Sequence, residues 1–148
     1  MMTFETNVHI GRTVEDVFDY VSDPLRFAQW NSAVRAVRAV RPVPSREAAQ
    51  YVMERELPGG RVENLIEVVA NERPIEFAIR SISGPTPFVY RYRFASAAGG
   101  AEIAFSGAFE LTGIAGLAGP LAKRAVKRGV DDNLATLKGL LEAQALSA

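Results

Sequence analysis

The sequence predicts an α+β domain in which an antiparallel sheet packs against one long C-terminal helix. Apolar and polar residues alternate with a period of two through the middle of the chain, and glycine pairs mark two of its turns. After Leu111 the apolar spacing changes to that of a helix. Consecutive strands with short turns form an antiparallel sheet, and a terminal amphipathic helix must bury its apolar stripe on it. The 148 residues match the length of one domain, so we expect a single domain over residues 1–148.

The first part of the chain predicts one strand and two short helices. Residues 4–10 alternate between apolar and polar side chains, which is typical of a half-buried strand. Thr13 offers an N-cap, and apolar residues then recur at helical spacing over residues 14–21. The aspartate before Pro24 offers a second cap with proline at the first helical position, so another short helix is expected toward Trp30.

The middle of the chain predicts a series of strands joined by hairpin turns. With Gly59 and Gly60 as the central pair of a turn, both can adopt positive φ, and Leu57 is then expected opposite Val62. The next turn is expected near Asn71. The predicted strands cover residues 50–57, 61–69, 74–82, 88–94 and 101–111.

The end of the chain predicts a last hairpin and the long helix. Tyr90 is expected opposite Gly107, where a glycine leaves space for an aromatic ring. The helix is expected to end near residue 145. Its apolar stripe is Val126, Val130, Leu134, Leu137 and Leu141. Arginines stand at every third position over residues 35–41, a spacing that fits neither a strand nor a helix.

The sheet face toward the helix combines aromatic and polar side chains. Alternation places the following residues on this face: Phe4, Thr6, Val8, Tyr51, Met53, Arg55, Asn64, Ile66, Phe77, Ile79, Ser81, Tyr90, Tyr92, Phe94 and Phe105. Its tyrosine hydroxyls, amide and guanidinium need partners, because an unsatisfied buried polar group costs about 1–3 kcal/mol. A curved sheet around a partly wet cavity would keep these groups satisfied. The alternative is a filled interior in which each group finds a partner within the protein.

Composition excludes several classes of function. Lys+Arg and Asp+Glu are 17 each, whereas nucleic-acid-binding proteins normally carry a basic excess. There is no cysteine and one histidine, which excludes disulfides, cysteine nucleophiles and metal sites built from thiolates or several histidines, so we expect no metal. We also expect no cofactor. His9 falls on the outer face of the first strand, which leaves a Ser-His-Asp triad without a base. No apolar run approaches the ~20 residues of a membrane-spanning helix, and no signal peptide is evident, so we expect a cytoplasmic protein.

Three segments carry a resemblance to a known family. They are residues 8–10 with the helix VEDVFDYV, the pair Asp23-Pro24 with Trp30-Asn31, and the C-terminal NLATLKGLLE. Together with the strand order they resemble the START-like, or SRPBCC, superfamily of helix-grip proteins, which includes polyketide cyclase/dehydrase and lipid-transport domains. The resemblance implies a curved antiparallel sheet of about six or seven strands that grips the long helix around an apolar or amphipathic small molecule. It carries no catalytic residue across.

We therefore expect a protein that binds a hydrophobic or amphipathic small molecule, lipid- or polyketide-like, between the sheet and the C-terminal helix. Arg55 is expected to hold a carboxylate or carbonyl oxygen of that molecule. The expected ligand-binding residues are Trp30, Tyr51, Met53, Arg55, Asn64, Phe77, Ile79, Tyr90, Tyr92 and Phe105.

Two other functions stay open. The first is a polyketide cyclase/dehydrase-type enzyme, in which Tyr90 or Tyr92 would donate a proton. The second is a non-catalytic protein-interaction domain with a filled interior. A monomer and a homodimer are both compatible with the sequence.

Four cations stand close together near the start of the predicted long helix. They are Lys123, Arg124, Lys127 and Arg128. A solvated helix face accounts for them, and a docking site for an anionic partner or a lipid headgroup is the alternative.

Overall fold

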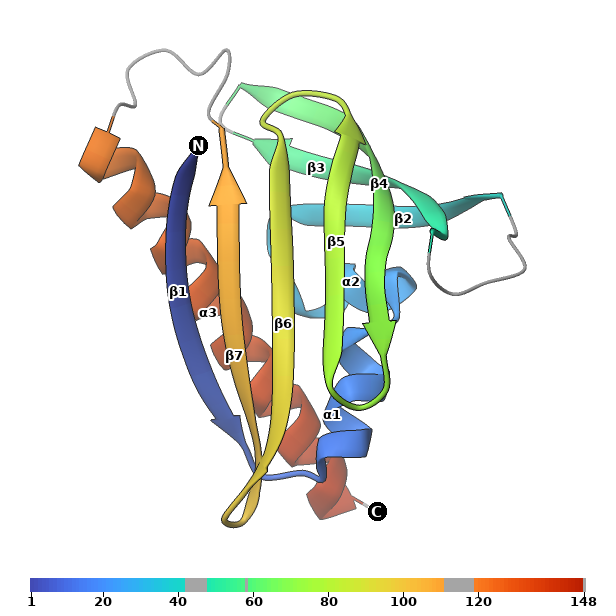
Figure 1. Cartoon of the computed structure of the whole chain (residues 1–148), viewed down its shortest axis with the longest axis vertical. Coiled ribbons are helices and arrows are strands. Elements are labelled where there is room, and N and C mark those ends of the chain that lie inside the picture. The colour runs from blue at the N-terminus through green and yellow to red at the C-terminus, as the bar shows by residue number, and fades with distance from the viewer. Residues whose placement is uncertain (42–47, 58, 111–118, 148) are drawn as a thin grey trace.

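The computed structural model describes residues 1–41, 48–57, 59–110 and 119–147, and it contains a seven-stranded antiparallel sheet with one long helix behind it (Figure 1). The elements are β1 (Met2–Ile10), α1 (Val14–Val21), the 3₁₀ turn η1 (Pro24–Arg26), α2 (Phe27–Trp30), β2 (Val34–Arg41), β3 (Gln50–Leu57), β4 (Gly60–Glu72), β5 (Glu76–Ser83), β6 (Phe88–Ala97), β7 (Gly100–Phe109) and α3 (Gly119–Ser147). The strand order is β1-β7-β6-β5-β4-β3-β2. This architecture confirms the predicted α+β fold.

Both short helical segments begin at the caps predicted for them. The Thr13 hydroxyl accepts a hydrogen bond from the Asp16 backbone N–H at 3.2 Å. The Asp23 carboxylate accepts one from the Leu25 backbone N–H at 3.1 Å, and Pro24 takes the first position of η1. These caps satisfy backbone donors that the helical turns leave without a partner.

The first hairpin differs from the prediction by two residues. Leu57 pairs with Gly60 and not with Val62. Gly60 has φ +119° and occupies the first position of β4, so Gly59-Gly60 is not the central pair of the turn. Position 58 lies outside the described residues. Because side chains alternate with a period of two, a shift of two residues leaves every side chain on its predicted face.

The predicted position is correct for the last hairpin but wrong for the turn between β4 and β5. Tyr90 pairs with Gly107, as predicted for the last hairpin. The turn expected near Asn71 lies later, because β4 continues to Glu72 and β5 begins at Glu76. Gly113 and Gly116, which precede the predicted long helix in the sequence, fall outside the described residues.

Strand β2 was not predicted, and its bulges explain why. The register with β3 shifts between Val34 and Ala36 and again between Ala39 and Arg41. Each bulge adds one residue to β2, so the alternation with a period of two is interrupted. As a result, positions 38 and 41 pair with residues only two apart in β3. The three-residue spacing of the arginines is therefore compatible with a strand.

The carboxyl-terminal half of α3 anchors the helix to the sheet. Its side chains Leu134, Leu137 and Leu141 are at most 2% exposed. The same half of the helix also bonds to the end of β1. Lys138 Nζ donates to the His9 carbonyl at 2.8 Å, and the Glu142 carboxylate accepts from the backbone N–H of Gly11, the residue after β1, at 2.8 Å. The predicted apolar stripe of α3 is thus confirmed. Within the described residues, no helix combines the length and apolar character needed to cross a bilayer.

We predict that Leu137→Ala lowers the free energy of unfolding by about 2–5 kcal/mol, because it leaves a cavity where a fully buried side chain packs. Leu121→Ala on the same helix is the control, since Leu121 is 70% exposed. Its effect should stay within about 0.5 kcal/mol. Urea unfolding measures both values, and similar losses in the two variants would contradict the assigned packing of α3.

Candidate ligand-binding site

A cavity of about 270 Å³ lies between the sheet and the amino-terminal half of α3. Its wall is mainly apolar, with a few polar groups placed among the aliphatic and aromatic side chains. The lining residues are Asn31, Ala33, Val34, Met53, Arg55, Leu57, Thr86, Phe88, Tyr90, Phe109, Ala122, Ala125, Val126, Gly129, Val130 and Asn133. This composition is typical of small-molecule sites.

The cavity exists because the side chains that α3 turns toward the sheet are smaller in its amino-terminal half than in its carboxyl-terminal half. Toward the cavity it presents the small residues Ala122, Ala125 and Gly129 together with Val126 and Val130, whereas its later turns present the longer leucines. A Cβ atom added to Gly129 would meet no heavy atom within 4 Å. Opposite the helix, the rings of Phe88 and Tyr90 pack with centroids 4.7 Å apart and form part of the sheet wall. The space is therefore bounded by small helix residues on one side and by aromatic rings on the other.

Arg55 is the charged group on the cavity wall. Its Nε–H donates to Asn64 Oδ1 at 2.9 Å, and its Nη2 donates to the Pro85 carbonyl at 3.1 Å and to the Thr86 hydroxyl. Its guanidinium carbon lies 5.1 Å from the centroid of the Phe88 ring. These contacts hold the guanidinium in one orientation.

Asn64 supports Arg55 from behind. It is fully buried, and its amide donates to the Pro85 carbonyl at 2.9 Å and to the Ser83 carbonyl at 3.3 Å. Gly84 packs directly against this amide with φ +104°, and a Cβ there would lie 2.7 Å from Asn64 Nδ2. Only glycine satisfies both conditions at this position. Asn64 therefore joins β4 to the β5–β6 loop and fixes the acceptors that Arg55 uses.

The charge of Arg55 has no carboxylate counterpart among the described residues. Burial lowers the pKa of the guanidinium, and among the described residues only Tyr90 opposes this shift. Burial also raises the pKa of the Tyr90 hydroxyl, with Arg55 partly opposing the shift. Arginine remains protonated even when partly desolvated. The cavity wall therefore carries one positive charge and, beside it, a tyrosine hydroxyl that is protonated at neutral pH.

Asparagine side chains close one end of the cavity. Asn133 of α3 accepts from the Ser32 backbone N–H at 3.1 Å and donates to Asn31 Oδ1 at 3.0 Å. Asn31 also accepts from the Ala33 backbone N–H at 3.0 Å. These bonds join α3 to the connection between α2 and β2, so the polar atoms at this end are largely satisfied within the protein.

The structure separates the predicted site residues into groups. Met53, Arg55 and Tyr90 line the cavity, and Asn64 lies directly behind Arg55. The other aromatic and aliphatic candidates are at most 4% exposed and belong to the core, outside the cavity lining: Trp30, Phe77, Ile79, Tyr92 and Phe105. The indole Nε1 of Trp30 has no hydrogen-bond partner within the described part of the chain. Ligand contact by any of these residues stays a prediction.

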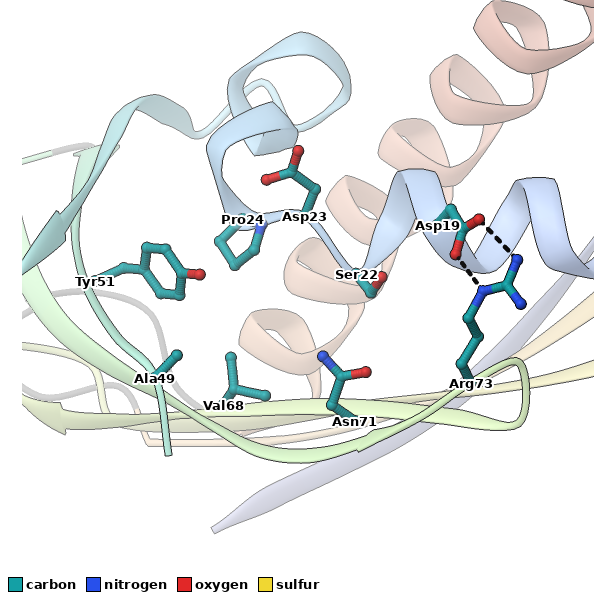
Figure 2. Close-up of a pocket in the computed structure, with 9 residues that line it drawn as sticks. All are labelled: Asp19, Ser22, Asp23, Pro24, Ala49, Tyr51, Val68, Asn71 and Arg73. Carbon is teal, nitrogen blue, oxygen red and sulfur yellow. Dashed lines mark hydrogen bonds and ion pairs between the residues drawn. The ribbon is translucent and has the colours of Figure 1, made fainter. Parts of the chain in front are cut away.

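Tyr51, the remaining candidate, lines a different hollow of about 450 Å³ between the α1–η1 segment and strands β3 and β4 (Figure 2). The charged groups there have partners within the protein. Asp19 forms a two-pronged ion pair with Arg73, with N–O distances of 2.8 and 3.0 Å, and Asp23 lies 3.3 Å from Arg26 Nε. Burial and the nearby Asp23 raise the pKa of Tyr51. Because its charges are already compensated, we place the candidate site in the sheet–helix cavity.

Sequence reasoning did not identify the helix side of the cavity. The spacing of Ala122, Ala125 and Gly129 follows one helix face and was the available signal. Thr86 was also not predicted, because it reaches Arg55 from a loop.

The histidine of the chain, His9, is not among the residues that line the cavity. The outer-face placement of His9 is confirmed, since this residue is exposed and its Nε2 lies 3.0 Å from the Ala98 carbonyl. Among the described residues, no group of three or more histidine, aspartate or glutamate side chains is placed to hold a metal ion.

Comparison with known proteins decides the family. The family described as "Polyketide cyclase / dehydrase and lipid transport" matches residues 1–142. The chain belongs to this family. No curated protein matches the sequence.

Solved structures show the same fold at low sequence identity. A START superfamily protein from Mycobacterium smegmatis has a TM-score of 0.83 and 14% identity, with 96% of this chain and 98% of that chain covered. The di-domain ARO/CYC StfQ from the steffimycin biosynthetic pathway has a TM-score of 0.75 and 16% identity, and the match covers 97% of this chain and 52% of StfQ. The di-domain ARO/CYC BexL from the BE-7585A biosynthetic pathway has a TM-score of 0.69 and 19% identity, and the match covers 96% of this chain and 49% of BexL. This chain therefore spans about half of each di-domain protein.

We predict that Asn64→Ala lowers the free energy of unfolding by about 1–3 kcal/mol, because it leaves Arg55 Nε–H without its partner and removes the hydrogen bonds from the Asn64 amide to the Pro85 and Ser83 carbonyls. Asn7→Ala is the control, since Asn7 is an exposed asparagine on a strand. Its effect should stay within about 0.5 kcal/mol. Chemical unfolding measures both variants, and an unchanged stability for Asn64→Ala would show that Asn64 does not hold the loop.

Proposed function

We propose that the protein binds an amphipathic small molecule whose apolar body fills the sheet–helix cavity and whose anionic or carbonyl oxygen contacts Arg55. The observation that carries the proposal is the uncompensated guanidinium on the wall of an apolar cavity. A charge away from water is costly unless it is paired. An acidic or carbonyl group of a ligand would supply the missing acceptor through a charge-assisted hydrogen bond.

The dimensions of the cavity limit the ligand. Its volume of about 270 Å³ lies just below the range of about 300–1,000 Å³ that is usual for ligand pockets. One or two fused rings, or a short acyl chain, suit this space better than a long lipid tail does. The aromatic rings on the sheet side favour a flat ring over a branched chain. The open volume also favours ligand binding over a protein-interaction domain with a filled interior.

The family supports this class of ligand. Its description joins polyketide cyclases/dehydrases with lipid transport, and two of the similar structures are named as ARO/CYC proteins. Molecules of both classes combine an apolar skeleton with carbonyl or carboxyl oxygens. Arg55 and the apolar wall around it match that combination.

Catalysis on such a molecule is the second candidate function, and Tyr90 is the observation that favours it. The Tyr90 hydroxyl and the Arg55 guanidinium belong to the same cavity wall, and burial keeps the hydroxyl protonated. In an aldol-type ring closure, the attacking carbon loses a proton and bonds to a carbonyl carbon, whose oxygen becomes an alkoxide. Arg55 would stabilise the negative charge on that oxygen, and Tyr90 would donate a proton to it and recover the proton that the attacking carbon lost. Tyr92, the other tyrosine considered for this role, lies in the core outside the cavity lining.

We predict that Arg55→Met lowers the affinity for naphthoate about tenfold or more, because it removes a charge-assisted hydrogen bond. Naphthylmethanol has the same ring system without the negative charge, and its affinity should change less than about threefold. Calorimetric titration with both probes measures the difference. Arg61→Met serves as the control, because Arg61 is an exposed arginine of β4 whose loss should leave both affinities unchanged. Equal losses for the two probes would contradict an anionic contact at Arg55.

We predict that Gly129→Leu abolishes naphthoate binding without lowering stability, because the new side chain would project into the cavity. Replacing a helix glycine should even stabilise the protein by up to about 1 kcal/mol. Gly139→Leu is a matched control, since Gly139 lies in the same helix, is exposed and also has open space at its Cβ. It should gain the same stability and retain binding. Normal binding by Gly129→Leu would place the ligand elsewhere.

A further inference from the structure

The amino-terminal end of α3 carries a concentration of positive charge that the proposed function does not use. We call Lys123, Arg124, Lys127 and Arg128 the basic end of α3. Three of these side chains, all but Lys127, are exposed. In a chain with a formal net charge of zero, so many cations within six residues form a marked local excess.

These cations are paired much less than those elsewhere in the described structure. Arg12, Arg73 and Arg93, for example, each lie within 3.1 Å of a carboxylate oxygen. In the basic end of α3 only Lys127 has such a contact, with Asp131 at 2.9 Å. The other three make no ion pair with any residue that the structure describes. Their charge is therefore directed to solvent or to a partner.

An exposed leucine stands beside the cations. Leu121 is 70% exposed, more than any other large apolar side chain of the described structure. The next residue, Ala122, and Ala125 one turn later belong to the cavity lining. Figure 1 shows this orange end of α3 beside the start of β1, at the opposite end of the helix from α1. The leucine and the cations thus lie where the cavity meets the molecular surface.

We propose that the basic end of α3, together with Leu121, docks on an anionic membrane surface. Cations around an exposed leucine suit a lipid interface, because the cations contact headgroups while the leucine enters the boundary with the acyl chains. An acidic protein would match the cations but would give the exposed leucine no comparable environment. The purpose of the contact rests on the proposed function: docking there places the cavity beside the bilayer in which an apolar ligand dissolves.

Vesicle binding tests the proposal directly. The complete protein is sedimented with vesicles of phosphatidylcholine alone and with vesicles that contain about one-third phosphatidylglycerol. We expect binding to the anionic vesicles only, and weaker binding at high salt because added ions screen the attraction. Each cation near the surface should contribute about fivefold to the affinity. The triple variant K123Q/R124Q/R128Q should therefore lose more than tenfold.

Matched variants distinguish a specific loss of the docking surface from the effects of lower net charge and of unfolding. R38Q/R61Q/R93Q removes the same number of charges from strands β2, β4 and β6, and it should retain vesicle binding. Leu121→Ser should weaken binding severalfold, whereas Leu25→Ser, at a side chain that is 56% exposed, should not. Chemical unfolding checks that each variant is folded.

The outcomes distinguish this proposal from the proposed function. We expect K123Q/R124Q/R128Q to lose vesicle binding and keep its affinity for naphthoate, and Arg55→Met to show the reverse. No binding to anionic vesicles, equal binding to neutral ones, or equal losses in the two triple variants would overturn the membrane contact. Binding to polyglutamate without binding to vesicles would also overturn it, in favour of an acidic protein partner.

Discussion

The contact between Arg55 and Asn64 organises the region around the cavity. It joins β3 to β4, and both side chains bind the same carbonyl in the β5–β6 loop, so three parts of the sheet share one polar cluster. Burying a guanidinium is unfavourable unless its hydrogen bonds are satisfied. The amide, the carbonyl and the Thr86 hydroxyl satisfy some of its donors but neutralise none of its charge. The same cluster thus joins these parts of the fold and leaves a positive charge on the cavity wall.

The two halves of α3 differ in how they pack against the sheet. The carboxyl-terminal half packs leucines against the sheet and bonds to the end of β1, which holds the helix in place. The amino-terminal half has alanine and glycine where it faces the sheet, and cations where it faces solvent. Small residues give up packing contacts, and a helix can retain them only if the rest of its length supplies the stability. In this chain the leucine-rich half does so.

Much of the fold was predictable because it depends on local patterns. Caps at Thr13 and Asp23, the pairing of Tyr90 with Gly107 and the leucines of α3 all follow from residues close in sequence or from strict alternation. Strand β2 was not predictable in this way, since two bulges interrupt its alternation. The first hairpin was misplaced by two residues because either glycine of the pair can take positive φ, and alternation does not distinguish the two registers.

The sequence by itself determined the layers of this protein, the face on which residues of the regularly alternating strands lie and the presence of a guanidinium on the buried face. Only the tertiary structure decided which of those inward residues surround open space. Tyr51 and Met53 are two residues apart on one face of β3, yet Tyr51 lines the hollow next to α1 and η1, whereas Met53 lines the sheet–helix cavity. Likewise Pro24, the first residue of η1, lines the hollow beside Tyr51, whereas Asn31, which directly follows α2, lines the cavity. Alternation assigns a side chain to a face, whereas a cavity depends on how the elements on that face are packed over it.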